Sequence, residues 1–233
     1  MKDDLAQVDY VEVSQPLELI KQADKNTPIV LDFDETLLLR NSTAEYINSL
    51  RPRWLGFVLI AFLRAIKPWT WLPKPWRGNN IRDWFLVVIP TIILPWTYYL
   101  WQKKARTLAQ NHGNKKLIVA VEQNSHSPII VASLGFNFVI QPILQHLAID
   151  YQQLIGCRFW QGASDCYQGK LFMMQSALTE AEIKSAIVVT DSKDDLPLLQ
   201  VVAHPCLALW PDAEYVNPFN DFWLYALLKR LKH

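Results

Sequence analysis

Three short apolar runs, each ending in polar side chains, recur along the sequence. They cover residues 28–31, 128–132 and 186–189. Runs that are apolar on both faces suit strands buried inside a parallel sheet. Pro28 is compatible with this interpretation because it opens its strand. The pattern therefore predicts an α/β fold whose strand ends carry the polar groups.

The remaining elements follow from helical spacing and capping signals. Residues 114–123 favour a helix, although 117–121 could equally form a strand. A polar loop containing Gly162 and Gly169 is expected to lead to Lys170, after which a helix begins. We further expect helices over 16–21, 41–50, 138–147, 171–178, 197–199 and 222–231, and strands over 154–157 and 204–210.

Residues 51–106 differ in composition from the rest of the chain. Seven of the ten tryptophans lie in this segment. Residues 54–63 carry no charge, and residues 84–101 form a second uncharged run that Pro90 and Pro95 interrupt. Tryptophan close to Arg and Lys is typical of membrane interfaces. The proline-rich link between the two runs carries the basic residues Lys67, Lys74, Arg77 and Arg82.

Topology restricts how this segment could meet a membrane. A spanning helix needs about 20 apolar residues, so the first run is too short and the second is barely long enough. If the chain before and after this segment forms one domain, the segment must cross the membrane an even number of times. A two-helix hairpin would then place the basic link on the far side, against the positive-inside tendency. We therefore expect a re-entrant or interface-lying hairpin, and the alternative is a soluble helical cap with an apolar inner face.

Composition limits the class of protein. The chain has 233 residues, 51% of them hydrophobic and 19% charged, with a net charge of +1. These values exclude a disordered chain and a protein that coats nucleic acid, so no nucleic-acid partner is expected. Cys157, Cys166 and Cys206 lack CxxC spacing, which indicates free thiols in a reducing compartment and no zinc site. The acidic first residues lack an apolar stretch, so no secretory signal is expected.

The first strand ends in two carboxylates, Asp32 and Asp34. Side chains two residues apart on an extended chain point the same way, so both should project together while Phe33 faces the core. Ligands of open α/β sheets bind at the carboxyl ends of the strands. Two carboxylates there repel each other unless a cation lies between them, and oxygen ligands favour Mg²⁺. Taken alone, the stretch could also be a strand that runs into an acidic turn.

Groups of related chemistry follow the other strands. Ser133 ends the second run, and its hydroxyl with nearby backbone N–H groups could hold an anionic oxygen. Asp191 and Asp195 follow the third run at a spacing that lets a turn bring both near a metal. Lys170 could stabilise phosphate charge, although a solvated lysine at a helix start is the ordinary interpretation of such a residue alone.

In this order, the groups resemble the four motifs of the haloacid dehalogenase-like hydrolase superfamily. The matching segments are Asp32-Phe33-Asp34-Glu35-Thr36, Ser133-Leu134-Gly135-Phe136, Lys170 and Asp191-Ser192-Lys193-Asp194-Asp195. The second has the form found in the phosphoserine-phosphatase-like branch. Each motif is weak alone, but four in order on matching strand ends are specific. The resemblance covers about residues 28–50 and 107–212.

The resemblance implies an architecture. It implies a three-layer, Rossmann-like parallel sheet with a helical cap inserted after the first strand. The catalytic core would comprise residues 1–40 and 107–233, and the Trp-rich cap residues 41–106. A similar arrangement with an apolar cap resembles the phosphatase-like domain fused to some membrane prenyltransferases.

The resemblance also implies a mechanism. Asp32 would attack phosphorus and form an aspartyl-phosphate, while Asp34 would protonate the leaving oxygen and then deprotonate water. Mg²⁺ would be held by Asp32, by the carbonyl of Asp34 and by Asp191, with Asp195 steadying the metal or its waters.

Further residues would bind the phosphoryl group and the substrate. Lys170 would act as a catalytic cation on the transferring oxygens. Two positions depart from the usual motifs, because Glu35 stands where glycine is commonest and Thr190 replaces the glycine before the fourth motif. The residues expected to bind substrate are Thr36, Ser133, Gly135 and Glu45.

The sequence therefore predicts a Mg²⁺-dependent phosphatase acting on a phosphomonoester, either a small molecule or a lipid or polyprenyl phosphate. The alternatives are a phosphotransferase or mutase using the same intermediate, and a catalytically idle, membrane-bound interaction module. The expected location is the cytoplasmic side of a membrane, with peripheral or re-entrant attachment, or otherwise the cytoplasm.

Overall fold

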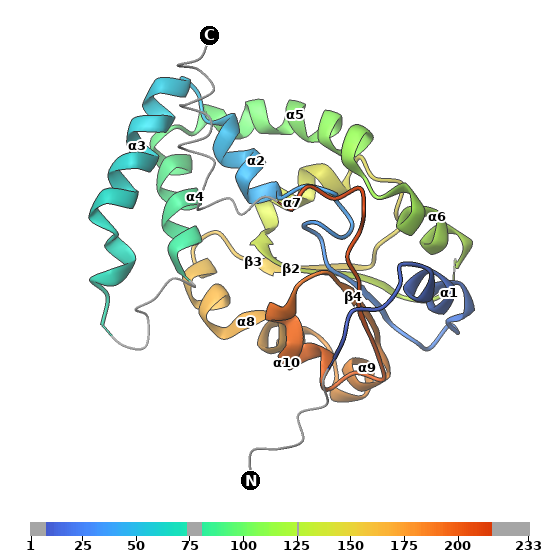
Figure 1. The fold of residues 1–233 in the computed structure, drawn as a ribbon. Coiled ribbons are helices and arrows are strands. Elements are labelled where there is room, and N and C mark those ends of the chain that lie inside the picture. The colour runs from blue at the N-terminus through green and yellow to red at the C-terminus, as the bar shows by residue number, and fades with distance from the viewer. Residues whose placement is uncertain (1–7, 74–80, 125, 216–233) are drawn as a thin grey trace.

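A five-stranded parallel sheet lies at the centre of the computed structural model, which describes residues 8–73, 81–124 and 126–215. The strand order is β3-β2-β1-β4-β5 (Figure 1). This arrangement confirms the predicted α/β fold, including its Rossmann-like parallel sheet. The strands are β1 (Ile29–Leu31), β2 (Ile129–Phe136), β3 (Gln153–Cys157), β4 (Ile187–Thr190) and β5 (His204–Leu207).

The central position of β1 explains its apolar sequence. Val30 lies opposite Ile130 of β2 on one side and opposite Val188 of β4 on the other. All three residues of β1 are buried, as are all four of β4. A strand with neighbours on both edges and helices on both faces has no solvent-facing position, so every side chain is aliphatic up to the strand end.

Helices cover both faces of the sheet. The helices α6 (Lys115–Gln123) and α7 (Asn137–Leu144) lie on one side, and α8 (Gly162–Ala177), α9 (Glu180–Ser185) and α10 (Leu196–Leu199) lie on the other (Figure 1). Right-handed crossovers require this division, because the chain moves outward from β1 to β3 and then returns to β4. The N-terminal helix α1 (Ser14–Gln22) packs on α6.

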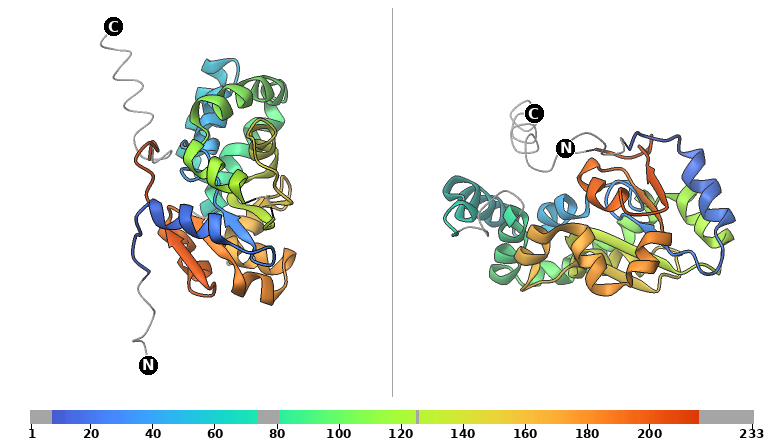
Figure 2. Two further views of the ribbon diagram at one scale, coloured as in Figure 1. Left: turned by 90° about the vertical axis from the view of Figure 1, so that its right-hand side faces the viewer. Right: turned by 90° about the horizontal axis from the view of Figure 1, so that it is seen from below.

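The segment between β1 and β2 is helical. It contains α2 (Ser42–Ser49), α3 (Arg53–Ile66), the short 3₁₀ helix η1 (Pro68–Thr70), α4 (Arg82–Ile93) and α5 (Trp96–His112). Figures 1 and 2 agree that α3 and α1 lie at opposite ends of the molecule.

The inserted helices pack partly on the sheet and partly on one another. Val87 and Trp101 belong to the main core beside the strands, whereas Ile60 and Leu86 belong to a smaller apolar cluster between α3 and α4. The helix α5 continues through residue 106, where we placed a domain boundary. The division into core and cap therefore stays a prediction, and its proposed C-terminal boundary falls inside a helix.

No single helix among the described residues is long and apolar enough to span a bilayer. The helices α4 and α5 together have the length and composition of a span, but the chain bends by 113° between them. Pro95 lies at this break, where α4 has ended and α5 begins. Membrane contact accordingly stays a prediction.

Several local predictions differ from the structure. The second strand continues past residue 132 to Phe136, and the helix expected over 138–147 ends at Leu144. Residues 162–168 are helical rather than a loop, because Gly162 fits against the ring of Phe136 and the chain breaks only at Gly169. The last strand ends at Leu207 rather than at residue 210, because its partner β4 ends at Thr190. Residues 114–123 form α6, which confirms the helix over the strand. The expected helix over 222–231, and Lys74 and Arg77 of the basic link, lie outside the described residues.

Candidate active site

The polar groups converge where the strand order changes direction. The chain runs from β1 to β2 on one side and returns to β4 on the other, so the switch point lies between β1 and β4. Open α/β sheets bind ligands in the crevice at this point. Asp32 follows β1 here, and Asp191 follows β4; the Asp32 N–H donates to Val189 O at 2.9 Å.

Asp32 is held at both carboxylate oxygens. Its Oδ1 accepts hydrogen bonds from the Phe33 N–H at 2.7 Å and from Lys170 Nζ at 2.8 Å. Its Oδ2 lies 2.9 Å from the hydroxyl of Thr190. Burial raises the pKa of Asp32 above its ordinary value, and the adjacent Lys170 opposes this shift. The contacts fix the orientation of a carboxylate that is only 8% exposed.

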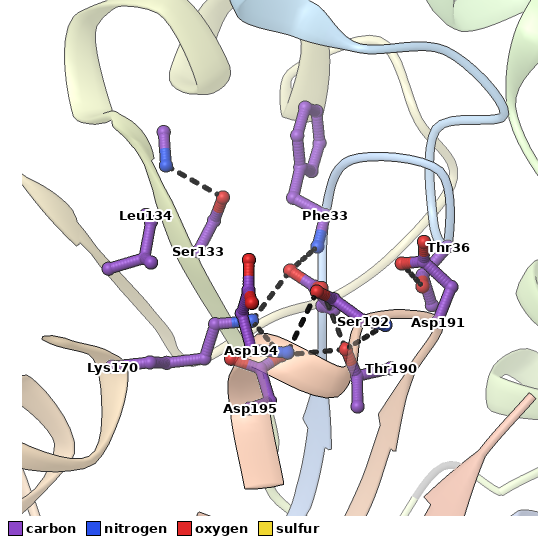
Figure 3. A network of polar contacts seen from close by, with 12 residues as sticks. Phe33, Thr36, Ser133, Leu134, Lys170, Thr190, Asp191, Ser192, Asp194 and Asp195 are labelled. Atoms are coloured by element: carbon purple, nitrogen blue, oxygen red, sulfur yellow. Dashed lines mark hydrogen bonds and ion pairs between the residues drawn. The ribbon is translucent and has the colours of Figure 1, made fainter. Parts of the chain in front are cut away.

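Lys170 is a buried cation between two carboxylates. Its Nζ lies 2.6 Å from Asp195 Oδ2 in addition to the contact with Asp32 (Figure 3). Burial alone would lower the pKa of Lys170, but the charges of Asp195 and Asp32 outweigh it and raise the pKa. The lysine is therefore charged, and this single cation lies between two carboxyl groups.

The backbone at Gly169 sets the position of Lys170. Gly169 has φ of 83° and ψ of 170° in the middle of α8, a conformation that L-residues with side chains rarely adopt. The helix therefore breaks at this residue and restarts at Lys170. The break turns the lysine inward, and its side chain becomes 5% exposed.

Asp34 lies at the N-terminus of α2. Its Oδ1 accepts the backbone N–H of Ser42 at 2.6 Å, and Asn41 caps the helix by accepting the Ala44 N–H. A helix N-terminus favours negative charge because its first N–H groups are unpaired and its dipole is positive there. Burial nevertheless raises the pKa of Asp34 to about 6, against the hydrogen bonds from Ser42. A carboxyl group with this pKa can exchange a proton near neutral pH.

The second motif approaches Asp34 through a glycine. A Cβ on Gly135 would lie 3.4 Å from Asp34 Oδ2 and only 2.9 Å from Ile140. The Gly135 N–H donates to Ser133 Oγ at 2.9 Å, and the pairing register of β2 and β3 shifts between Ala132 and Phe136. The irregular strand end thus places the Ser133 hydroxyl and a bare backbone beside the carboxylates.

The donor set fits a magnesium ion that keeps several waters. No group of three or more His, Cys, Asp or Glu side chains in the described residues forms a ready metal site. Mg²⁺ is usually bound through one or two carboxylates with waters and substrate oxygens. The site offers two carboxylates, Asp32 and Asp191, together with the backbone carbonyl of Asp34. Burial and then the charge of Asp32 raise the pKa of Asp191 to about 7, which a nearby cation would counteract.

A comparison with protein families agrees with this geometry. The family model of the haloacid dehalogenase-like hydrolases matches residues 29–200. The chain belongs to this family. No curated protein and no solved structure shows significant similarity to it. The family confirms the superfamily predicted from the four motifs and supports a hydrolase, whereas the phosphoserine-phosphatase-like branch stays a prediction.

The structure brings most of the predicted site residues of this hydrolase together. Thr36 Oγ donates to Asp191 Oδ1 at 2.9 Å, which joins the first motif to the fourth (Figure 3). The carboxyl group of Asp195 accepts hydrogen bonds from Lys170 and Thr190, so it lies beside the lysine. Glu45 forms no part of this network, because its carboxylate pairs with Lys104 at 2.6 Å. The roles of Asp195 with the metal and of Glu45 with the substrate stay predictions.

The departure at Glu35 has a structural explanation. Glu35 has φ of 55°, in the left-handed region that favours glycine. The glycine that is commonest at this position would adopt it without strain. Glu35 is half-buried, and burial followed by the charges of Asp34 and Asp191 raises its pKa to about 9. Glu35 therefore adds a carboxyl group whose ionisation is disfavoured beside Asp34 and Asp191.

Two groups of the site were not assigned a role from sequence. One is the Ser42 N–H on Asp34, which the capping signal at Asn41 could have indicated because it locates the free N–H groups of α2. The other is the Thr190 hydroxyl, which lies 2.9 Å from Asp32 Oδ2 and 2.6 Å from Asp195 Oδ2. This hydroxyl has one proton, so it donates to only one of the two carboxylates at a time.

Replacing Thr190 by valine is expected to lower kcat about 10- to 100-fold with little change in KM. The isosteric change removes a hydrogen bond to a charged group, which is worth about 1.5–3 kcal/mol. Thr190→Ser keeps the hydroxyl and should restore most of the rate. Steady-state kinetics on both variants, with melting curves, make the test. Equal kcat in the valine and serine variants would show that the hydroxyl does not orient Asp32.

Proposed function

We propose that this hydrolase is a Mg²⁺-dependent phosphatase that cleaves phosphomonoesters through an aspartyl-phosphate on Asp32. The observation that carries the proposal is the fixed Asp32 carboxylate, oriented by Lys170 and Thr190, with Asp34 two residues further on. A nucleophile that is already oriented needs little reorganisation before attack.

The first half-reaction transfers the phosphoryl group to the protein. An oxygen of Asp32 forms a bond to phosphorus while the bond from phosphorus to the ester oxygen breaks. Asp34 gives its proton to the departing oxygen, so an alcohol leaves. Lys170 and the hydroxyl of Ser133 support the phosphoryl oxygens, which is mainly a matter of positioning and charge. The proton of the Thr36 hydroxyl is donated to Asp191, so the role of Thr36 toward the substrate stays a prediction.

The second half-reaction returns the protein to its initial state. Asp34, now ionised, takes a proton from water, whose oxygen attacks phosphorus. The bond between phosphorus and Asp32 breaks, and inorganic phosphate leaves. The helix N-terminus at Ser42 stabilises Asp34 in the charged form that accepts this proton.

The metal would be held by Asp32, Asp191 and the Asp34 carbonyl. When bound, Mg²⁺ supplies positive charge that offsets the repulsion between the phosphate and the carboxylates. Asp191 is positioned for this role by the Thr36 hydroxyl at 2.9 Å.

Phosphate release from a panel of phosphomonoesters is expected to require Mg²⁺. The Asp191→Asn variant should raise the Mg²⁺ midpoint at least about tenfold, because it removes an anionic ligand. Asp194→Asn is the matched control, because Asp194 is exposed and close in sequence. Release that is independent of Mg²⁺, or an unchanged midpoint in Asp191→Asn, would contradict the metal site. The absence of release from every ester would contradict the proposed function.

A further inference from the structure

Large apolar side chains face solvent at one end of the molecule. They lie on α3 and where α4 bends into α5, and Trp54 is 68% and Tyr99 74% exposed. Large patches of this kind on soluble proteins mark interaction sites. We call this surface the α3/α5 face and define it by Trp54, Phe57, Phe62, Ile92, Trp96 and Tyr99.

The helix α3 is apolar on its outer side as well as its inner side. Its buried residues Gly56, Ile60 and Leu63 face the cluster shared with α4. A helix on the surface of a soluble protein normally carries polar side chains on the opposite side, but α3 has Trp54, Phe57 and Phe62 exposed. The tryptophans therefore do not serve only as the core of a cap.

The two parts of the face are joined by hydrogen bonds. Trp96 Nε1 donates to the carbonyl of Arg51 at 2.6 Å, and the Arg51 N–H donates to Thr97 Oγ1 at 3.4 Å. The beginning of α3 and the beginning of α5 thus meet at one point. Figure 1 shows α3, α4 and the start of α5 together at the same end of the fold.

The charge around the face is positive. Residues 46–106 contain ten Lys and Arg residues and a single acidic residue, Asp83, although the whole chain has 23 basic and 22 acidic residues. Arg53, Lys103 and Arg106 are exposed on the same two helices, α3 and α5, and none forms an ion pair with another described residue. Aromatic and aliphatic side chains bordered by unpaired cations complement an anionic lipid surface.

The helix α2 connects this face to the active site. Its first N–H contacts Asp34, and the chain just after its last residue reaches Arg51 beneath Trp96. The helix has 8 residues, which corresponds to about 12 Å at 1.5 Å per residue. The catalytic carboxylates therefore lie close to the edge of the face.

We infer that the α3/α5 face docks on an anionic bilayer, and that the substrate is a lipid carrying a phosphate monoester in its headgroup. The docking is inferred from the exposed apolar and basic residues of the α3/α5 face alone, whereas the substrate class rests on the proposed function. The lipid phosphate would enter the site while its chains stay in the bilayer. This arrangement avoids the cost of moving the chains through water.

Flotation of the full-length protein with vesicles tests the docking without any activity. We expect binding to phosphatidylcholine vesicles that contain phosphatidylglycerol, and much weaker binding to phosphatidylcholine alone. The double variant Trp54→Ala/Phe62→Ala should bind at least about tenfold more weakly than the wild type, because it removes two apolar side chains from the contact. Trp160→Ala is the matched control, since Trp160 is also 68% exposed but lies between β3 and α8.

The charged residues give an independent arm of the same test. The double variant Arg53→Gln/Lys103→Gln should bind the anionic vesicles about fivefold more weakly for each charge removed. Added salt should also weaken this binding, because it screens the charges. Absence of vesicle binding, or equal binding by Trp54→Ala/Phe62→Ala and Trp160→Ala, would overturn the inference. A dimer that Trp54→Ala dissociates would assign the face to a second copy and would also overturn it.

Rates on two substrates separate the docking from the proposed function. The Trp54→Ala/Phe62→Ala variant should lose activity on a lipid phosphate monoester in anionic vesicles and retain it on a soluble ester. Vesicle binding without hydrolysis of either substrate would disprove the proposed function and leave the docking intact. Hydrolysis of the soluble ester without vesicle binding would disprove the docking and leave the proposed function intact.

Discussion

The Asp32→Asn variant is expected to release phosphate at least about 10³-fold more slowly than the wild type and to keep its fold. The substitution removes the attacking charge, and loss of a covalent nucleophile typically costs at least this factor. The fold should persist because asparagine keeps the shape of the side chain and the buried site loses one of the two carboxyl groups around a single lysine. Lys170 should keep its other partner, Asp195, which lies 2.6 Å away in the unsubstituted protein.

Rate and stability are measured on the same preparation. Phosphate release gives the first quantity, and a thermal melt followed by circular dichroism gives the second. Asp150→Asn, at an exposed position far along the chain, controls for the loss of one carboxylate. Near-normal turnover in Asp32→Asn would rule out the aspartyl-phosphate mechanism, whatever the melting temperature.

The Lys170→Met variant should lose both stability and activity. Methionine has a similar length but no charge, so Asp32 and Asp195 would face each other in a buried site without a cation. Removing one partner from a buried ion pair costs about 3–5 kcal/mol. For a chain of this size that corresponds to a fall in Tm of about 6–20 °C. Activity should fall at least about 10²-fold, because the phosphoryl oxygens also lose a cation.

A second substitution distinguishes charge from packing. Lys170→Met/Asp195→Asn removes one of the two unpaired carboxylates, so it should regain part of the lost stability while activity stays low. Denaturant unfolding of the two single variants and the double variant completes a thermodynamic cycle. If the effects of the two substitutions on stability simply add, the contact of Lys170 with Asp195 does not stabilise the fold.

The sequence identified the central strands and the carboxylates at their ends. The aliphatic runs of β1 and β4 lead directly to Asp32 and Asp191, because burial on both faces leaves no alternative pattern. In β2 the polar Ser133 follows the run where the regular pairing with β3 shifts, although the strand continues to Phe136. The positions of Asp32, Asp34 and Asp191 then follow from parallel strands that share one carboxyl edge. The pairing of Thr36 with Asp191 across 155 residues agrees with that arrangement.

Contacts between distant segments were harder to predict. The Thr190 hydroxyl contacts Asp32, which is 158 residues away in sequence, and local sequence patterns do not predict contacts at such a separation. The helix over 162–168 was missed because its stabilising contacts, such as Gly162 against Phe136, come from another element. Likewise, the uncharged run 84–101 did not indicate that its last residue, Trp101, is fully buried and donates to Val139 O at 3.0 Å.

The break at Gly169 has a consequence for how the site tolerates change. A Cβ at this position would have no heavy atom within 4 Å, so no neighbour excludes a larger side chain. The restriction comes from the backbone dihedral, which is unfavourable for L-residues and allowed for their mirror images. The position of the Lys170 cation thus depends on the handedness of residue 169 rather than on its size. An alanine of the D configuration would suit this position, whereas natural L-alanine would strain it.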